Sequence, residues 1–169
     1  RSGTAGIADT GTHPVRASGA FPAIGRWESI LAMVELLEKM PPDLVFAASE
    51  YGLIGSCFPR MTIVDLVGLH DRAMARQGFR VEHVLSRTPD LIWLPHSDYT
   101  VMVSSLTEHP AFIRGYDYYP GAYEYGIAIN RQSPLHAAVT AIAGAELLRI
   151  YGADNVAAPP ESSFPKSRE

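Results

Sequence analysis

The feature that most constrains the fold of this chain is the alternation of short apolar segments with stretches of helical periodicity. The apolar segments, which indicate buried strands, span 44–48, 61–67, 91–94 and 124–130. The helical stretches span 26–40, 71–77, 81–86, 99–105 and 134–151. Strands that alternate with helices form a sheet covered on both faces, and continuously apolar strands suit that burial. The sequence therefore predicts a three-layer α/β/α domain with a small, mainly parallel, Rossmann-like sheet, and leaves an antiparallel orientation open for the last strand.

The composition supports one folded domain. Of the 169 residues, 47% are hydrophobic, which supplies a core for a domain of ordinary size, about 100–150 residues. We expect this domain at 26–152, between a Gly-, Ser- and Pro-rich leader at 1–25 and a Pro- and Ser-rich tail at 153–169. The formal net charge of -4 argues against nucleic acid as a partner, because nucleic-acid binding needs a basic face.

The beginning of the chain suggests a piece of a longer protein. The first residue is Arg1 rather than Met, and no signal peptide is visible. The sequence also lacks a transmembrane span, which would need about 18 consecutive apolar residues. We therefore expect a soluble domain that belongs to a larger protein.

Polar side chains cluster where the predicted strands end. In open α/β sheets, ligands bind beyond the carboxyl ends of the strands, so these side chains are the candidate ligand-binding residues. They are Glu50 after the first strand, Asp65, His70 and Asp71 at the second, and His96 and Asp98 after the third.

The histidines and acids of this group allow two interpretations. His70 or His96 could act as a general base oriented by Asp71 or Asp98, and the same groups could hold a divalent cation. Alternatively, the acids cap the helices that follow, as Asp commonly does after a strand. We favour capping, because many such loops carry no chemistry, and we leave metal binding open.

Asp65 is unusual because it falls inside an apolar strand. A buried carboxylate needs partners, so we expect Asp65 either to accept hydrogen bonds or to pair with Arg60 or Arg72. In either case it would anchor the loop that follows. A ligand-binding role is the less favoured alternative.

The segment after Glu50 contains Gly52 and Gly55, and we expect it to form a turn. It lacks the GxxxxGK pattern followed by Ser or Thr, and its GLIG is too short for a GxGxxG fingerprint, so we expect no cofactor. Cys57, the single cysteine, is expected to be a small core residue rather than a nucleophile.

Residues 116–125 have the most unusual composition, with five tyrosines and two acids. Aromatic faces stack on sugars and acids accept hydrogen bonds from sugar hydroxyls, so Tyr118, Tyr119 and Tyr123 are candidate glycan-binding residues. The alternatives are a loop that packs its rings over the edge of the sheet, or a protein interface.

The stretch LVFAASEYGLIGSCFPRMTIVDLVGLHD, residues 44–71, carries a family resemblance. A turn with an acid and two glycines precedes a strand that ends in a D-x-x-G-L-x-D element, and the next strand follows as PDLIWL. The matching residues are Glu50, Gly52 and Gly55 in the turn, Asp65, Gly68, Leu69 and Asp71 in the element, and 89–94 in the strand. This pattern resembles the C-terminal extracytoplasmic domain of polytopic membrane glycosyltransferases that use polyprenyl-phosphate sugars, in particular arabinofuranosyltransferase- and mannosyltransferase-like proteins.

The resemblance implies an accessory domain on the periplasmic or extracellular side of the membrane. Such a domain would bind an acceptor glycan or a polyprenyl-linked sugar, or brace the membrane part. The catalytic carboxylate of these enzymes is expected in the membrane-embedded half, so the resemblance assigns no catalytic residue to this chain. The two alternatives are a small stand-alone hydrolase or metal enzyme that uses the His/Asp cluster, and a protein-interaction domain that uses the tyrosine segment.

Overall fold

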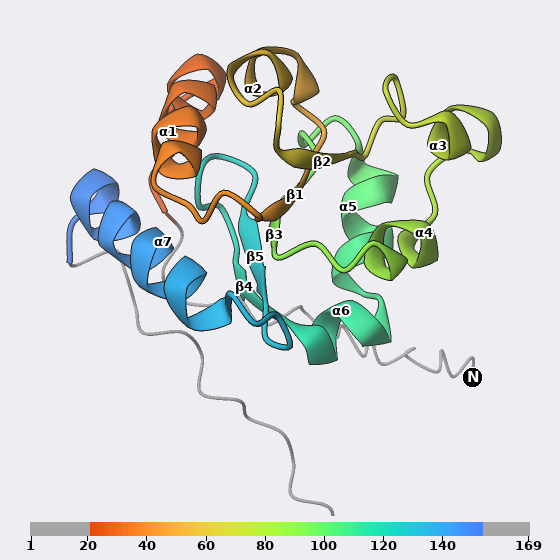
Figure 1. The fold of residues 1–169 in the computed structure, drawn as a ribbon. Helices are drawn as coiled ribbons and strands as arrows, with labels where there is room; N and C mark the ends of the chain where they lie inside the picture. The colour runs from red at the N-terminus through yellow and green to blue at the C-terminus, as the bar shows by residue number, and fades with distance from the viewer. Residues whose placement is uncertain (1–20, 154–169) are drawn as a thin grey trace, which may run out of the picture.

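A five-stranded sheet forms the centre of the part of the chain that the structure describes, residues 21–153 of a computed structural model (Figure 1). The strands lie in the order β2-β1-β3-β5-β4. Their bounds are β1 Val45–Ala48, β2 Thr62–Asp65, β3 Leu91–Trp93, β4 Tyr116–Tyr119 and β5 Ile127–Asn130. The four strands predicted from apolar runs all form, because buried β-branched and aromatic side chains favour extended backbone.

The sheet is mixed rather than mainly parallel. β1 pairs in parallel with β2 and with β3, whereas β5 is antiparallel to both β3 and β4. The expectation of an α/β domain is confirmed, and the last strand takes the antiparallel orientation that the sequence left open. The antiparallel share is larger than predicted because β4 adds a second antiparallel pairing.

β4 corrects the interpretation of the tyrosine segment as a loop. Alternate side chains of this edge strand point to opposite faces of the sheet. Tyr116 and Tyr118 pack against Phe112, with ring centroids 5.3 and 5.8 Å away, and Asp117 on the other face bonds His136. The signal for a strand was the run of aromatic residues, which are enriched in strands, although the Pro120-Gly121 pair that follows is also compatible with a loop.

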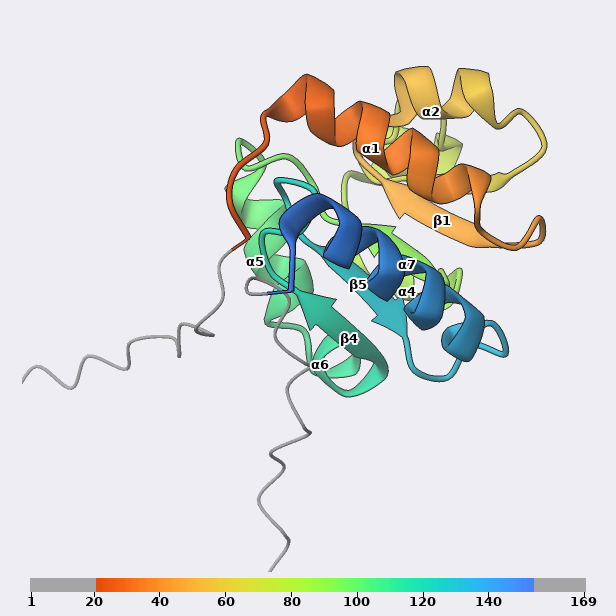
Figure 2. The same ribbon diagram turned by 90° about the vertical axis from the view of Figure 1, so that its left-hand side faces the viewer.

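Seven helices surround the sheet within the described residues. They are α1 Arg26–Glu38, α2 Tyr51–Cys57, α3 Arg72–Gln77, α4 Val81–Ser86, α5 Thr100–Thr107, α6 Pro110–Gly115 and α7 His136–Tyr151. Figures 1 and 2 show α1 and α7 packed side by side on one face of the sheet, with α4 and α5 on the other. The described residues include the whole of the predicted domain at 26–152, and most of the predicted leader and tail lies outside them.

α2 and α6 were not predicted. The glycines of α2 indicated a turn, but Gly55 is needed for packing within a helix: a Cβ at this position would lie 2.5 Å from Cε1 of Tyr51. Cys57 at the end of α2 is exposed, so its assignment to the core was wrong. Among the described residues, no helix combines the length and the apolar character needed to cross a membrane.

Candidate functional site

The carboxyl ends of β1, β2 and β3 lie at one edge of the sheet, because the three strands are parallel. β2 is added to the sheet on one side of β1, and β3 is added on the other side. The order in which strands are added therefore reverses between β1 and β3. Such a topological switch point is where α/β domains bind ligands. The polar residues at this edge form two separate groups, one at the end of β2 and one between β1 and β3.

At the end of β2, Asp65 anchors the following loop. Its Oδ1 accepts hydrogen bonds from the backbone N–H of Val67 at 3.0 Å and of Gly68 at 3.1 Å, and its Oδ2 accepts from the N–H of His70 at 2.7 Å. The residue is only 2% exposed. This confirms hydrogen bonding and the anchoring role, while neither Arg60 nor Arg72 pairs with Asp65.

Gly68 is required at the turn that Asp65 holds. Its φ is +87°, which L side chains rarely adopt, and a Cβ there would lie 2.7 Å from Cβ of Met74. The D-x-x-G-L-x-D element is therefore a closed backbone structure, in which an acid binds the amide groups that a glycine turn presents.

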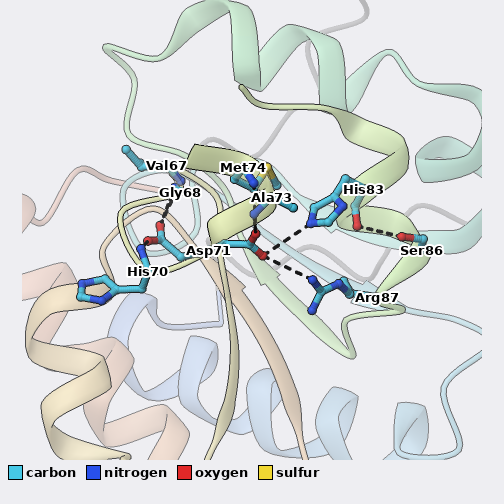
Figure 3. Close-up of polar contacts among 10 residues, drawn as sticks. Val67, Gly68, His70, Asp71, Ala73, Met74, His83, Ser86 and Arg87 are labelled. Carbon is cyan, nitrogen blue, oxygen red and sulfur yellow. Dashed lines mark hydrogen bonds and ion pairs between the residues drawn. The ribbon is translucent and has the colours of Figure 1, made fainter. Parts of the chain in front are cut away.

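Asp71 caps α3 and also faces an imidazole and a guanidinium group (Figure 3). Its Oδ1 accepts from the N–H of Ala73 at 2.8 Å and of Met74 at 3.0 Å, and its Oδ2 lies 3.5 Å from both His83 Nε2 and a guanidinium nitrogen of Arg87. The N–H of Met74 lowers the pKa of Asp71 most; burial opposes this, and Ala73 and His83 lower the pKa further, so it lies below its usual value. The capping interpretation is thus confirmed.

Next to Asp71 is a cavity of about 560 Å³, which we call the arginine cavity. The residues that characterise it are three arginines, a histidine, an acid and an amide, namely Arg72, Arg76, Arg87, His70, Asp71 and Gln77. Sequence reasoning named His70 and Asp71 as candidate ligand-binding residues but missed the arginines. The spacing of Arg72 and Arg76 on a predicted helix was the available signal, since residues four apart lie on one side of a helix.

Between β1 and β3 lies a second group, the switch-point cluster, defined as Arg26, Glu50, His96 and Tyr125. The guanidinium of Arg26 bonds both carboxylate oxygens of Glu50, at 3.0 and 3.1 Å. The His96 ring lies 4.9 Å from the Tyr125 ring, and the backbone N–H of His96 donates to Ser49 Oγ at 3.1 Å. α1, the loop after β1, the loop after β3 and the segment before β5 thus meet at one place.

Tyr125 is the distinctive member of the switch-point cluster. It is 9% exposed, and its buried hydroxyl has no hydrogen-bond partner among the described residues. Burial, followed by the charge of Glu50, raises the pKa of Tyr125 to about 12, so the hydroxyl stays protonated and can donate. Its ring stacks on that of Trp93, with centroids 5.3 Å apart.

The predicted His/Asp cluster does not assemble. The ring of His70 stacks on Tyr51 at 4.1 Å and, as Figure 3 shows, points away from the carboxylate of Asp71. His96 pairs with the exposed Asp98, Nδ1 to Oδ2, at 3.3 Å. No hydrogen bond or ion pair in the described part of the chain joins the two groups.

The described residues do not form a metal site. Within residues 21–153, no group of three or more His, Cys, Asp and Glu side chains is placed to hold a metal ion. His70 and Asp71 at the end of β2 and His96 and Asp98 after β3 stay in separate groups, so the shared metal or acid/base centre does not form within the described residues.

The three tyrosines predicted to bind a glycan lie elsewhere. Tyr118 and Tyr119 are half-buried on β4, and burial raises the pKa of both hydroxyls. Tyr123 is fully buried, with its carbonyl accepting from Trp93 Nε1 at 2.9 Å, so its ring cannot stack on a sugar. Arg26 and Tyr125 are the residues of this region that sequence reasoning missed.

Comparison with known proteins gives one match. A family model described as a domain of unknown function (DUF8728) matches residues 15–148, which is most of the chain. No curated protein and no solved structure matches the chain.

Proposed function

We propose that this chain, which belongs to the DUF8728 family, is a ligand-binding domain that is not catalytic by itself and whose switch-point cluster binds a hydroxyl-rich ligand such as a glycan. The observation that carries the proposal is the Tyr125 hydroxyl, which is buried and unpartnered among the described residues. Leaving such a group without a partner costs about 1–3 kcal/mol, so a ligand that pairs with it recovers this free energy.

The chemistry of the cluster suits sugar hydroxyls, which both donate and accept hydrogen bonds. Tyr125 offers a donor, the Glu50 carboxylate accepts, and the Arg26 guanidinium has donors beyond those used by Glu50. Tyr99, the 40% exposed residue just before α5, supplies an aromatic face. It lies near Arg26, whose pKa is raised mainly by Glu50 and to a smaller extent by Tyr125 and Tyr99.

The backbone holds the Tyr125 hydroxyl in place. Tyr123 and Glu124 adopt φ of +53° and +70°, a left-handed conformation that persists only where the surroundings enforce it. The carboxylate of Glu124 accepts from the N–H groups of Ile24 and Gly25, which tightens this turn against the start of α1. A polar group held this rigidly loses little conformational entropy when a ligand binds.

For the wider context, we propose an accessory domain of a membrane glycosyltransferase-like protein, located on the periplasmic or extracellular face. Its ligand would be the acceptor glycan or a polyprenyl-linked sugar. The support is the D-x-x-G-L-x-D element, whose residues form a closed loop at the end of β2. Helices on both faces of the sheet support a three-layer, Rossmann-like arrangement (Figure 2).

Tryptophan fluorescence can test binding at the cluster. Trp93 stacks on Tyr125, whereas Trp27 is exposed, so a Trp27→Phe background isolates the Trp93 signal. We expect arabinofuranosyl- or manno-oligosaccharides to change this signal saturably, and Tyr125→Phe to weaken binding about tenfold by removing one hydrogen bond.

Tyr123→Phe is the matched control, because it also removes a buried, unpartnered hydroxyl but from a ring enclosed in the core. It should leave the affinity unchanged. If neither oligosaccharide binds, or if both variants bind as the parent does, the glycan proposal is wrong. The membrane context fails separately if the full reading frame encodes no run of transmembrane helices upstream.

A further inference from the structure

We propose that the arginine cavity binds the phosphate group of a small phosphorylated molecule. This inference uses residues outside the switch-point cluster and does not depend on the proposed function. The cavity, of about 560 Å³, lies beside α3 at the end of β2. Its size falls within the range of small-molecule sites, about 300–1,000 Å³.

The cavity carries uncompensated positive charge. Arg72 and Arg76 lie four residues apart on α3, and neither has a carboxylate partner among the described residues. Like charges at this spacing destabilise a helix, and α3 contains no acid to offset them. Residues 70–87 hold four arginines against two acids in a chain whose net charge is -4, so the positive charge is locally concentrated.

The one acid of the cavity is already engaged. Asp71 accepts from two backbone N–H groups through Oδ1, and its Oδ2 faces His83 and Arg87 at 3.5 Å. Arg87 also lines the cavity, and Figure 3 shows its guanidinium facing the carboxylate of Asp71. Two guanidinium groups therefore remain available to an anion.

Phosphate is the anion that this set of donors fits best. A guanidinium presents a planar fork of N–H groups that binds the oxygens of carboxylate or phosphate in pairs. Arg72 and Arg76 offer two such forks to the terminal oxygens of a phosphate ester. Gln77 adds an amide that can bond the remainder of the molecule, for which the cavity has space.

The phosphate could belong to a soluble molecule or to a lipid headgroup. Leu69, 83% exposed, is adjacent in the chain to His70 of the cavity. An exposed apolar side chain beside basic groups is a feature of membrane-surface binding. The two sources share the same chemistry, and the experiment separates them.

The first arm uses calorimetric titration of the full chain with glucose 1-phosphate, with glucose and sodium sulfate as comparisons at constant ionic strength. We expect glucose 1-phosphate to bind and glucose not to bind. The Arg72→Gln/Arg76→Gln variant should lose at least tenfold in affinity. An Arg60→Gln/Arg114→Gln variant, which removes the same charge from exposed arginines outside the cavity, should bind as the parent does.

The second arm measures co-sedimentation with phosphatidylglycerol vesicles and with phosphatidylcholine vesicles. If the lipid is the source, the chain binds the anionic vesicles, Arg72→Gln/Arg76→Gln abolishes binding, and Leu69→Ser weakens it. Leu69→Ser should leave the binding of glucose 1-phosphate unchanged if the soluble molecule is the source.

Nuclear magnetic resonance of the arginine side chains in the parent protein keeps the test independent of variant folding. The Nε–H signals of Arg72 and Arg76 should shift with whichever probe binds. The proposal is overturned if neither glucose 1-phosphate nor the anionic vesicles bind, if sulfate competes equally well, or if the shifts fall on Arg60 and Arg114 instead.

Discussion

The loop after β2 and the edge between β1 and β3 contain similar acids that have opposite roles. After β2, both carboxylate oxygens of Asp65 and Oδ1 of Asp71 accept hydrogen bonds from backbone N–H groups. Between β1 and β3, Glu50 pairs only with the exposed Arg26, and the nearby Tyr125 hydroxyl lacks a partner among the described residues.

The hydrogen-bond partners of an acid thus separate structural from functional polar groups at one edge of a sheet. Acids that satisfy backbone amides stabilise the fold, and their removal leaves buried donors unpaired. An ion pair with an exposed member, such as Arg26 with Glu50, contributes little to stability, and our proposal assigns this pair to ligand binding. Stability measurements on the two regions can test this division.

The largest effect is expected for Asp65→Ala. It leaves three N–H groups, those of Val67, Gly68 and His70, without their acceptor, and should lower the free energy of unfolding by about 3 kcal/mol or more. Chemical denaturation monitored by circular dichroism would measure the loss.

Asp98→Ala serves as the matched control, because this carboxylate is 86% exposed and its one ion pair with a described residue is with His96. The change should stay within about 0.5 kcal/mol. Asp65→Asn, which keeps one acceptor oxygen, should fall between the two. Equal losses for Asp65→Ala and Asp98→Ala would contradict the division between the two regions.

An intermediate effect is expected at Asp71 as a function of pH. Its pKa is lowered in the folded chain, so its contribution to stability is complete above the unfolded-state value of about 4 and is lost as pH falls through the folded-state pKa. The free energy of unfolding should therefore fall in acid below about pH 5.

Asp71→Asn isolates this contribution because Asn also caps helices but carries no charge. The variant should show a shallower acid slope. Part of the slope should persist, since the pKa of Glu146, which Lys39 and Arg149 contact, is lowered as well. An unchanged slope would show that the charge of Asp71 does not stabilise the fold.

The smallest effect is expected for Glu50→Gln in the switch-point cluster. The Arg26 side chain is 57% exposed, so the ion pair should contribute less than about 1 kcal/mol and less still at high salt. Thermal unfolding at low and high salt would measure it. A loss as large as that of Asp65→Ala would mean that the cluster holds the fold together.

Much of the fold could be predicted because local patterns carried it. The apolar run 91–94 forms β3, the stripe at 26–40 forms α1, and the helix predicted at 81–86 forms with those bounds. β4 and α2 were missed because their local signals, aromatic residues before a Pro-Gly turn and two glycines, also fit loops. Pairing with β5 and the packing of Tyr51 over Gly55 decided between the alternatives.

The candidate sites were less predictable. Helical spacing could predict that Arg72 and Arg76 lie on the same side of α3. The roles of Asp65 and Asp71 followed from the burial of Asp65 and from the preference of Asp for helix caps. Arg26 and Glu50 are 24 residues apart, and Tyr125 meets them only through the order of the strands. No local pattern reports such a meeting.

The sequence alone determined where most strands and helices form, because this depends on hydrophobic periodicity. It also determined which acids accept hydrogen bonds from the backbone, because those bonds join residues only a few positions apart. Only the tertiary structure decided which polar groups remain unsatisfied. That outcome depends on which segments the sheet brings together, and pairing between segments distant in the chain is a property of the whole fold.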